Sequence, residues 1–298
     1  MKWGEALKAY QHYLKLERGL AQNSIINYSY DIQKLIDYIG TYKLEVSPLT
    51  ISSLDLQTFI QHIGKSYESR SQARILSGLK GFFAFLRLQN YREDNPLTPI
   101  ETPKQERKLP DTLSVSEIDK LINQIDLSHP QGERNRAIIE TLYGCGLRVS
   151  ELINLKLSDL FFEEGFIKVT GKGSKQRLIP INNLTVKYIN IYKQRERNLI
   201  KIQPKHEDFL FLNRRGKQLT RAMIFTITKT LAEKAQLNKN ISPHTFRHSF
   251  ATHLLENGAN LRVIQQMLGH ESITTTEIYM HLDRTHLKEV VENFHPRR

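Results

Sequence analysis

A proline-rich segment divides the sequence into two parts, and each part has its own pattern of hydrophobic residues. The segment "DNPLTPIETPKQERKLPDTL", residues 94–113, contains four prolines and mixed charges without a hydrophobic period. Proline interrupts helices and disfavours a helical residue before it, so the segment predicts a linker. The length of 298 residues also suits two domains of roughly 100–200 residues each. We expect an N-terminal domain at residues 1–93, a linker at 94–112 and a second domain at 113–298.

The N-terminal part predicts four amphipathic helices. In the first, Leu7, Tyr10, Leu14 and Leu16 fall near one face. The stretches "SIINYSYDIQKLIDYIG", "SLDLQTFIQHIG" and "SRSQARILSGLKGFFAFLRLQ" repeat such a pattern. Four short helices of this kind make a small bundle, and no catalytic cluster is recognisable among them.

The second part predicts a mostly helical domain with one small sheet. "SVSE" at Ser114–Glu117 is a capping box that begins a helix. In "GFIKVTGKGSKQRLIPI", two alternating, β-branched segments flank a glycine-rich turn, which is typical of a β-hairpin. The predicted fold class is therefore mainly α, with an N-terminal four-helix domain and a mostly helical C-terminal domain that carries a small antiparallel β-sheet.

The charge of the chain predicts an acidic partner. The formal net charge is +12 and the pI about 9.6, which is typical of proteins that bind nucleic acid or an anionic membrane surface. Residues 1–105 carry 13 Lys and Arg against 10 Asp and Glu, and residues 106–298 carry 30 against 21. We therefore expect most anion contacts in the C-terminal part.

The single cysteine and the hydropathy pattern indicate a cytoplasmic protein. Cys145 has no partner for a disulfide within the chain, which fits a reducing compartment, and its sequence context predicts a small buried residue. No apolar run reaches the ~18 residues of a membrane span, and the N-terminus "MKWGEALKAY" does not resemble a signal peptide.

The stretch "HTFRHSFATHL" at residues 244–254 is the densest group of candidate functional residues. Ser242 and Pro243 predict that a helix begins here. His244 and His248 have the i, i+4 spacing of helical metal ligands, but no acidic residue accompanies them, and Arg247 would repel a dication. His244 and Arg247 at i, i+3 instead share a helix face, and a guanidinium binds phosphate oxygens in a bidentate fork.

Other stretches supply groups of matching chemistry. Arg148 precedes a predicted helix, where free backbone N–H groups favour anions, and Lys172 lies in the tight turn of the hairpin. His270 follows Gly269, and Tyr279 lies nine residues later. Each residue also has an ordinary interpretation on its own: a surface salt bridge, a solvated hairpin tip or a core aromatic.

Together, these groups give the sequence a strong resemblance to the tyrosine recombinase family, and especially to its Xer chromosome-dimer-resolution type. The resemblance is carried by "GLRVSELINLKLSDL", "GKGSKQRLIPI", "SPHTFRHSFATHLLENGANLRVIQQMLGH" and "TTTEIYMHL", and it covers essentially the whole chain. "GLRVSEL" favours an XerD-like over an XerC-like assignment.

The resemblance implies a recombination mechanism. Tyr279 would attack the scissile phosphate and form a covalent 3′-phosphotyrosine, and strand exchange would pass through a Holliday junction. No metal or other cofactor is implied, because arginines neutralise the phosphate. The implied catalytic residues are Arg148, Lys172, His244, Arg247, His270 and Tyr279.

The resemblance also implies partners. The substrate would be double-stranded DNA at a specific dif-like site, bound in a homo- or heterotetramer with a sister Xer recombinase, possibly activated by a septal DNA translocase. The tail residues Leu287, Val290, Val291 and Phe294 would form an amphipathic helix that docks into a neighbouring subunit. No membrane partner is expected, and the protein would be cytoplasmic and nucleoid-associated. The expected DNA contacts are Arg70, Arg74, Lys80, Lys175 and Arg221.

Three alternatives remain open from the sequence. A type IB topoisomerase uses a similar catalytic set, although the compact N-terminal bundle and the tail argue against it. An integrase of a mobile element is a second alternative, and a catalytically silent DNA-binding protein is a third.

Overall fold

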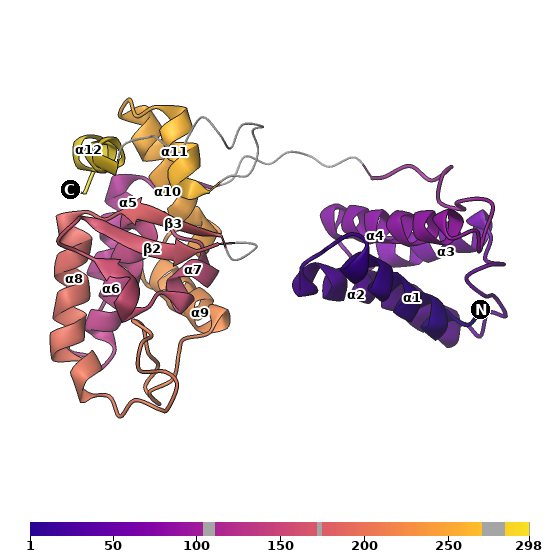
Figure 1. Cartoon of the computed structure of the whole chain (residues 1–298), viewed down its shortest axis with the longest axis horizontal. Helices are drawn as coiled ribbons and strands as arrows, with labels where there is room; N and C mark the ends of the chain where they lie inside the picture. Colours follow the sequence, from indigo (N-terminus) through magenta and orange to yellow (C-terminus); the bar gives the residue numbers. More distant parts are fainter. Residues whose placement is uncertain (104–110, 172–174, 270–283, 298) are drawn as a thin grey trace. The chain divides into compact units, whose positions relative to one another are not determined.

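The chain forms two compact units (Figure 1). They comprise Met1–Lys108 and Leu109–Arg298. The computed structural model describes residues 1–103, 111–171, 175–269 and 284–297.

The first unit is a helical bundle, as predicted. In its described part, α2 packs against α1 and α4, and α3 packs against α4. The core between the helices contains Ile32, Leu35, Leu56, Leu76 and Phe82, all of which are buried. The helices are α1 (Trp3–Leu16), α2 (Gln22–Thr41), α3 (Ser53–Gly64) and α4 (Ser69–Leu88).

Two details of this unit differ from the sequence pattern. Leu16 is 77% exposed, whereas Tyr10 and Leu14 are buried, so the prediction that Leu16 joins their face is wrong. At ~100° per residue, Leu16 lies about 200° around the helix from Leu14. Leu97 and Ile100, in the proline-rich segment, are buried in the core of this unit, so the bundle includes the start of that segment.

The second unit combines helices with a small sheet, as predicted. The strands β1 (Leu160–Phe161), β2 (Phe166–Thr170) and β3 (Gln176–Pro180) are antiparallel in the order β1-β2-β3. Between β2 and β3 the register runs from Phe166 opposite Pro180 to Thr170 opposite Gln176. The helices are α5 (Val115–Asn123), α6 (Gly132–Gly144), α7 (Val149–Asn154), α8 (Asn183–Arg195), α9 (Arg221–Lys234), α10 (Pro243–Glu256), α11 (Leu261–Leu268) and α12 (Arg284–Phe294).

Helix α10 lies at the centre of this unit. It contacts α6, α9, α11 and α12, and Phe246, Phe250 and Leu254 on its inner face have no exposed surface. Burying three such side chains contributes roughly 1.5–3 kcal/mol each. Because α10 packs against four helices, the polar side chains on its other faces have defined positions next to those helices.

The predicted starts of two helices are confirmed. Ser114 Oγ accepts from the backbone N–H of Glu117 at 3.2 Å, and Glu117 Oε2 accepts from the N–H of Ser114 at 2.8 Å. Helix α10 begins at Pro243, with Ser242 in the preceding extended position. Proline has no N–H to leave unsatisfied at this end of a helix.

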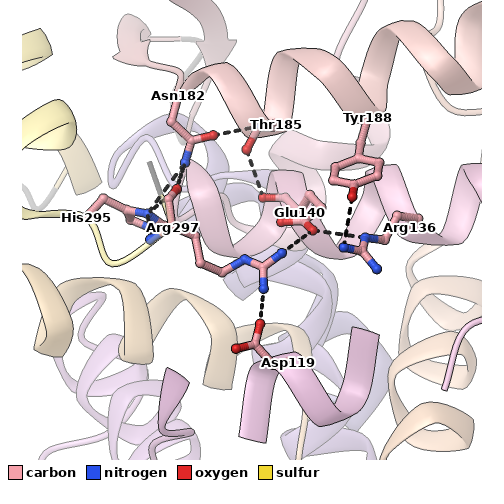
Figure 2. A network of polar contacts seen from close by, with 8 residues as sticks. All are labelled: Asp119, Arg136, Glu140, Asn182, Thr185, Tyr188, His295 and Arg297. Carbon is pink, nitrogen blue, oxygen red and sulfur yellow. Dashed lines mark hydrogen bonds and ion pairs between the residues drawn. The ribbon is translucent and has the colours of Figure 1, made fainter. Parts of the chain in front are cut away.

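Helix α12 packs on its own unit, against α10 and β3. The residues that follow it enter a polar network with α5, α6 and α8 (Figure 2). Arg297 Nη2 donates to Glu140 Oε1 at 2.7 Å, Arg297 Nη1 pairs with Asp119, and Asn182 Nδ2 donates to the carbonyl of Arg297 at 2.7 Å. The end of the described chain is therefore anchored by charge as well as by apolar contact.

Candidate active site

Three arginines surround one buried carboxylate in the second unit. Glu151, on α7, has a side chain that is 1% exposed. Its Oε1 accepts from Arg148 Nη1 at 2.9 Å and from Arg177 Nη1 at 2.8 Å. Its Oε2 accepts from Arg177 Nη2 at 3.0 Å and lies 4.0 Å from Arg247 Nη1. Arg148 and Arg247, which are 99 positions apart in sequence, thus share one anion.

Arg148 is placed by the beginning of α7. It is the N-cap residue of that helix, and its backbone N–H donates to Glu151 Oε2 at 2.8 Å. Its side chain is 32% exposed. A guanidinium held at its base and open to solvent at one side can receive an external anion.

Arg247 lies deeper in the unit, on α10. Its Nη1 donates to the carbonyl of Gly146 at 2.7 Å, and its Nη2 donates to the carbonyl of Leu268. Gly146 has φ +58°, and a Cβ there would lie 2.5 Å from Phe250 Cδ1. Only glycine therefore brings this carbonyl to Arg247 without displacing the core.

The same three arginines bind the end of α11. Arg177 Nε donates to the carbonyl of Met267 at 2.9 Å, and Arg148 Nη2 donates to the carbonyl of Gly269 at 3.0 Å. With the Arg247 contact to Leu268, three consecutive carbonyls are satisfied. Carbonyls at a helix C-terminus have no partner within the helix and carry partial negative charge, so cations stabilise this end.

The cluster has a net positive charge, because three guanidinium groups surround one carboxylate. Burial by itself would raise the pKa of Glu151, but hydrogen bonds and charge from Arg177 and Arg148 hold it below its usual value. Burial and the neighbouring Arg148 lower the pKa of Arg247 to about 10. Glu151 and Arg247 are therefore both ionised at neutral pH. The surplus of guanidinium groups over carboxylates attracts an anion such as phosphate.

The histidines of α10 differ in environment. His244, in the first turn, is exposed, whereas Arg247 one turn later is buried. His253 is buried, and its Nδ1 lies 2.7 Å from the hydroxyl of Tyr143. His253 therefore makes a structural hydrogen bond inside the unit. Among the described residues, no three His, Cys, Asp or Glu side chains gather as a metal-binding group.

Half of the predicted catalytic residues can be placed. The structure brings Arg148 and Arg247 together and puts His244 at the start of the helix that carries Arg247. Lys172, His270 and Tyr279 lie outside the described residues. Cys145 is buried, as predicted, and burial raises its pKa.

The predicted DNA contacts have different surroundings. Arg70 is exposed and, with Arg74, lines a surface cavity on α4. Arg74 Nη1 pairs with Asp31 Oδ2 at 2.7 Å and stays half exposed. Lys80 Nζ donates to the carbonyl of Ile100 at 2.7 Å, so this ammonium already has a partner. In the second unit, Lys175 and Arg221 are exposed.

Sequence reasoning missed two members of the cluster. Glu151 and Arg177 do not belong to the set of residues predicted from the sequence. A weak signal was available for Arg177, because this charge directly precedes the apolar residues Leu178 and Ile179 of the predicted strand. Its partners lie 26 and 90 positions away in the sequence, which no local pattern reveals.

Comparison with known proteins identifies the family of the chain. The model of the phage integrase family matches residues 111–286, and that of the SAM-like N-terminal domain of phage integrases matches residues 7–90. Tyrosine recombinase XerD of Listeria innocua is 41% identical over 287 residues, which cover 96% of this chain and 97% of that protein. The chain belongs to the phage integrase family of tyrosine recombinases.

Further comparisons refine the assignment of this tyrosine recombinase. XerD of Oceanobacillus iheyensis is 40% identical over 295 residues, which cover 98% of this chain and 98% of that protein. The crystal structure of XerH bound to its palindromic difH substrate after cleavage has a TM-score of 0.72 at 27% identity, covering 92% of this chain and 81% of that one. These comparisons confirm the prediction that the protein is a recombinase of XerD-like type, which is an enzyme of DNA strand exchange.

Proposed function

We propose that this tyrosine recombinase cuts and rejoins double-stranded DNA at a dif-like site and thereby resolves chromosome dimers. The observation that carries the proposal is the shared position of Arg148 and Arg247 beside one buried carboxylate, with surplus positive charge. The XerD relatives and the similarity to XerH bound to difH support the choice of substrate. A cytoplasmic, nucleoid-associated location follows from that substrate. No helix in the described ranges is long and apolar enough to span a membrane.

In the proposed reaction, the hydroxyl of Tyr279 attacks the scissile phosphorus. The new bond joins the tyrosine oxygen to the 3′-phosphate, and the bond to the 5′-oxygen breaks. Arg148 and Arg247 bind the non-bridging oxygens and stabilise the charge that develops in the transition state. The phosphotyrosine conserves the phosphodiester, so the attack of a 5′-hydroxyl from the partner strand completes exchange without ATP.

The remaining roles come from the family resemblance. Lys172 donates a proton to the leaving 5′-oxygen, His244 accepts or relays the proton of Tyr279, and His270 hydrogen-bonds the phosphate. Free tyrosine has a pKa of about 10, so its attack near neutral pH needs such assistance. Because arginines and lysine do this work, the reaction requires no metal.

The proposed assembly is a tetramer on synapsed DNA, formed with copies of this chain or with a sister Xer recombinase. A septal DNA translocase is a further proposed partner. Docking of the tail helix into a neighbouring subunit belongs to the same proposal. In the single chain, Leu287, Val290 and Val291 of α12 are buried against their own unit, so exchange would require this helix to leave one hydrophobic site for an equivalent one.

The decisive experiment uses a duplex that carries a dif-like sequence with a nick close to the expected cleavage position. Cleavage then releases a short strand and traps the covalent adduct. We expect an adduct at Tyr279, formed equally well in EDTA and without nucleotide, and none with Tyr279→Phe. An adduct with Tyr279→Phe would refute the nucleophile assignment.

A plasmid with two such sites separates recombination from topoisomerase activity. The proposal predicts resolution into two circles when the partner recombinase is present. Relaxation of supercoils without resolution would instead support a type IB topoisomerase, and binding without any adduct would support a silent DNA-binding protein.

A further inference from the structure

Arg177 is enclosed at the centre of the arginine cluster. It lies on β3, and its side chain is 17% exposed. A Cβ at Gly269 would lie 3.2 Å from Arg177 Nε, and one at Gly171 would lie 3.3 Å from Nη1. Two glycines thus border the guanidinium, and larger residues there would press on it.

Each of the three guanidinium nitrogens of Arg177 donates to a protein oxygen. Two go to the oxygens of Glu151, at 2.8 Å and 3.0 Å, in the bidentate geometry that only a guanidinium provides. The third goes to the carbonyl of Met267 at 2.9 Å. Arg177 therefore joins β3, α7 and the end of α11, which are the elements around Arg148 and Arg247.

The bidentate pair also determines where Glu151 points. With both oxygens bound to Arg177, Glu151 keeps Arg148 at 2.9 Å but leaves Arg247 at 4.0 Å. Without Arg177, Oε1 of Glu151 would stay paired with Arg148, whereas Oε2 would lose its charged partner and move toward Arg247, the nearest guanidinium to which Glu151 is not yet hydrogen-bonded. Arg247 would then be paired with Glu151 and would have less positive charge to offer to a phosphate.

We propose that Arg177 is a positioning residue for the recombination reaction. By binding Oε2 of Glu151, it keeps Arg247 from pairing with that carboxylate, so that Arg247 can bind the scissile phosphate together with Arg148. This inference rests on the proposed function, in which those two arginines bind that phosphate. Arg177 itself does not contact DNA in this scheme.

The test is single-turnover cleavage of the nicked dif-like duplex at saturating full-length protein. Arg177→Met should lower the cleavage rate constant by about tenfold to a hundredfold, because misplaced catalytic groups cost factors of this size. The Kd for the duplex should change by less than about threefold, because all three guanidinium nitrogens of Arg177 already donate to protein oxygens. Arg195→Met is the matched control, because the side chain of Arg195 is 73% exposed. Its Nη1 lies 3.5 Å from Glu133 Oε1, which makes a weak surface ion pair. This variant should cleave at the wild-type rate.

A double variant separates positioning from a merely structural role. In Arg177→Met/Glu151→Gln, the neutral amide no longer attracts Arg247, so cleavage should be faster than with Arg177→Met alone. A purely structural contribution predicts that the second substitution slows cleavage further. Wild-type cleavage by Arg177→Met, or no recovery in the double variant, would overturn the proposal.

Two further measurements keep the outcome unambiguous. If thermal melting shows that Arg177→Met does not fold, the cleavage rate is measured with Arg177→Lys in its place. Arg177→Lys keeps the charge but not the bidentate fork, so it should cleave more slowly than wild type, and an unchanged rate would refute the role. Absence of a Tyr279 adduct with the wild-type protein would refute the proposed function itself, independently of Arg177.

Discussion

At the scale of single residues, His295 makes stability depend on pH. It is fully buried, packs against the ring of Tyr143 at 4.7 Å between centroids, and accepts at Nδ1 from the backbone N–H of Arg297 at 3.2 Å. Burial lowers its pKa to about 4. In the unfolded chain, a histidine has a pKa near 6.5. Between about pH 6.5 and pH 4, the unfolded chain therefore binds a proton at His295 that the folded chain does not bind. The free energy of unfolding falls as the pH drops below about 6.5.

We therefore predict that the second unit loses about 2 kcal/mol of stability from His295 between pH 7.5 and pH 5. Urea unfolding at the two pH values measures the change. The variant His295→Gln should lose most of that difference, whereas His244→Gln, at an exposed position, should retain it. An equal pH dependence in His295→Gln and wild type would contradict the assignment.

At the scale of elements, α12 is held by an ion-pair network as well as by its apolar face. Arg297 contacts Glu140, whose side chain is 3% exposed, and Arg136 Nε donates to the same carboxylate at 3.0 Å (Figure 2). Removing Arg297 leaves Glu140 with Arg136 as its remaining ion-pair partner among the described residues. Breaking a buried pair in this way costs about 3–5 kcal/mol, because a charge remains without adequate compensation.

We expect Arg297→Met to destabilise the second unit by about 2–4 kcal/mol, somewhat less than a complete loss because Arg136 remains. Denaturant unfolding followed by far-ultraviolet circular dichroism gives the value. Arg195→Met removes an exposed arginine at 3.5 Å from Glu133 and should change stability by less than about 0.5 kcal/mol. Similar values for the two variants would show that the network contributes little.

At the scale of the whole molecule, the net charge of +12 predicts salt-dependent DNA binding. Each neutralised phosphate releases counterions and adds about 0.9 to the slope of log affinity against log salt. Arg70 is exposed, while Lys80 already donates to the carbonyl of Ile100. Arg70→Gln should therefore reduce the slope by about one, and Lys80→Gln by less. A fluorescence-anisotropy titration at several salt concentrations tests this order, and a larger effect of Lys80→Gln would reverse it.

The sequence by itself determined the elements and the family. Caps, turns and hydrophobic periodicity act over a few residues, so they can be recognised in the sequence. They predict the beginnings of the helices at Ser114 and Pro243, the hairpin and the four helices of the first unit. The motif around Arg247 pointed to phosphate chemistry for the same reason, because residue types and short spacings are readable without a fold.

The tertiary structure alone decided how these groups are used. It exposed Leu16, gave Lys80 and Arg74 partners in their own unit, and gathered Arg148, Arg177 and Arg247 around Glu151. Ion pairs and carbonyl contacts join residues that are tens of positions apart, and their geometry depends on how helices and strands pack. The charge of each arginine is fixed by its chemistry, but whether that charge remains free for DNA depends on the groups that the fold brings beside it.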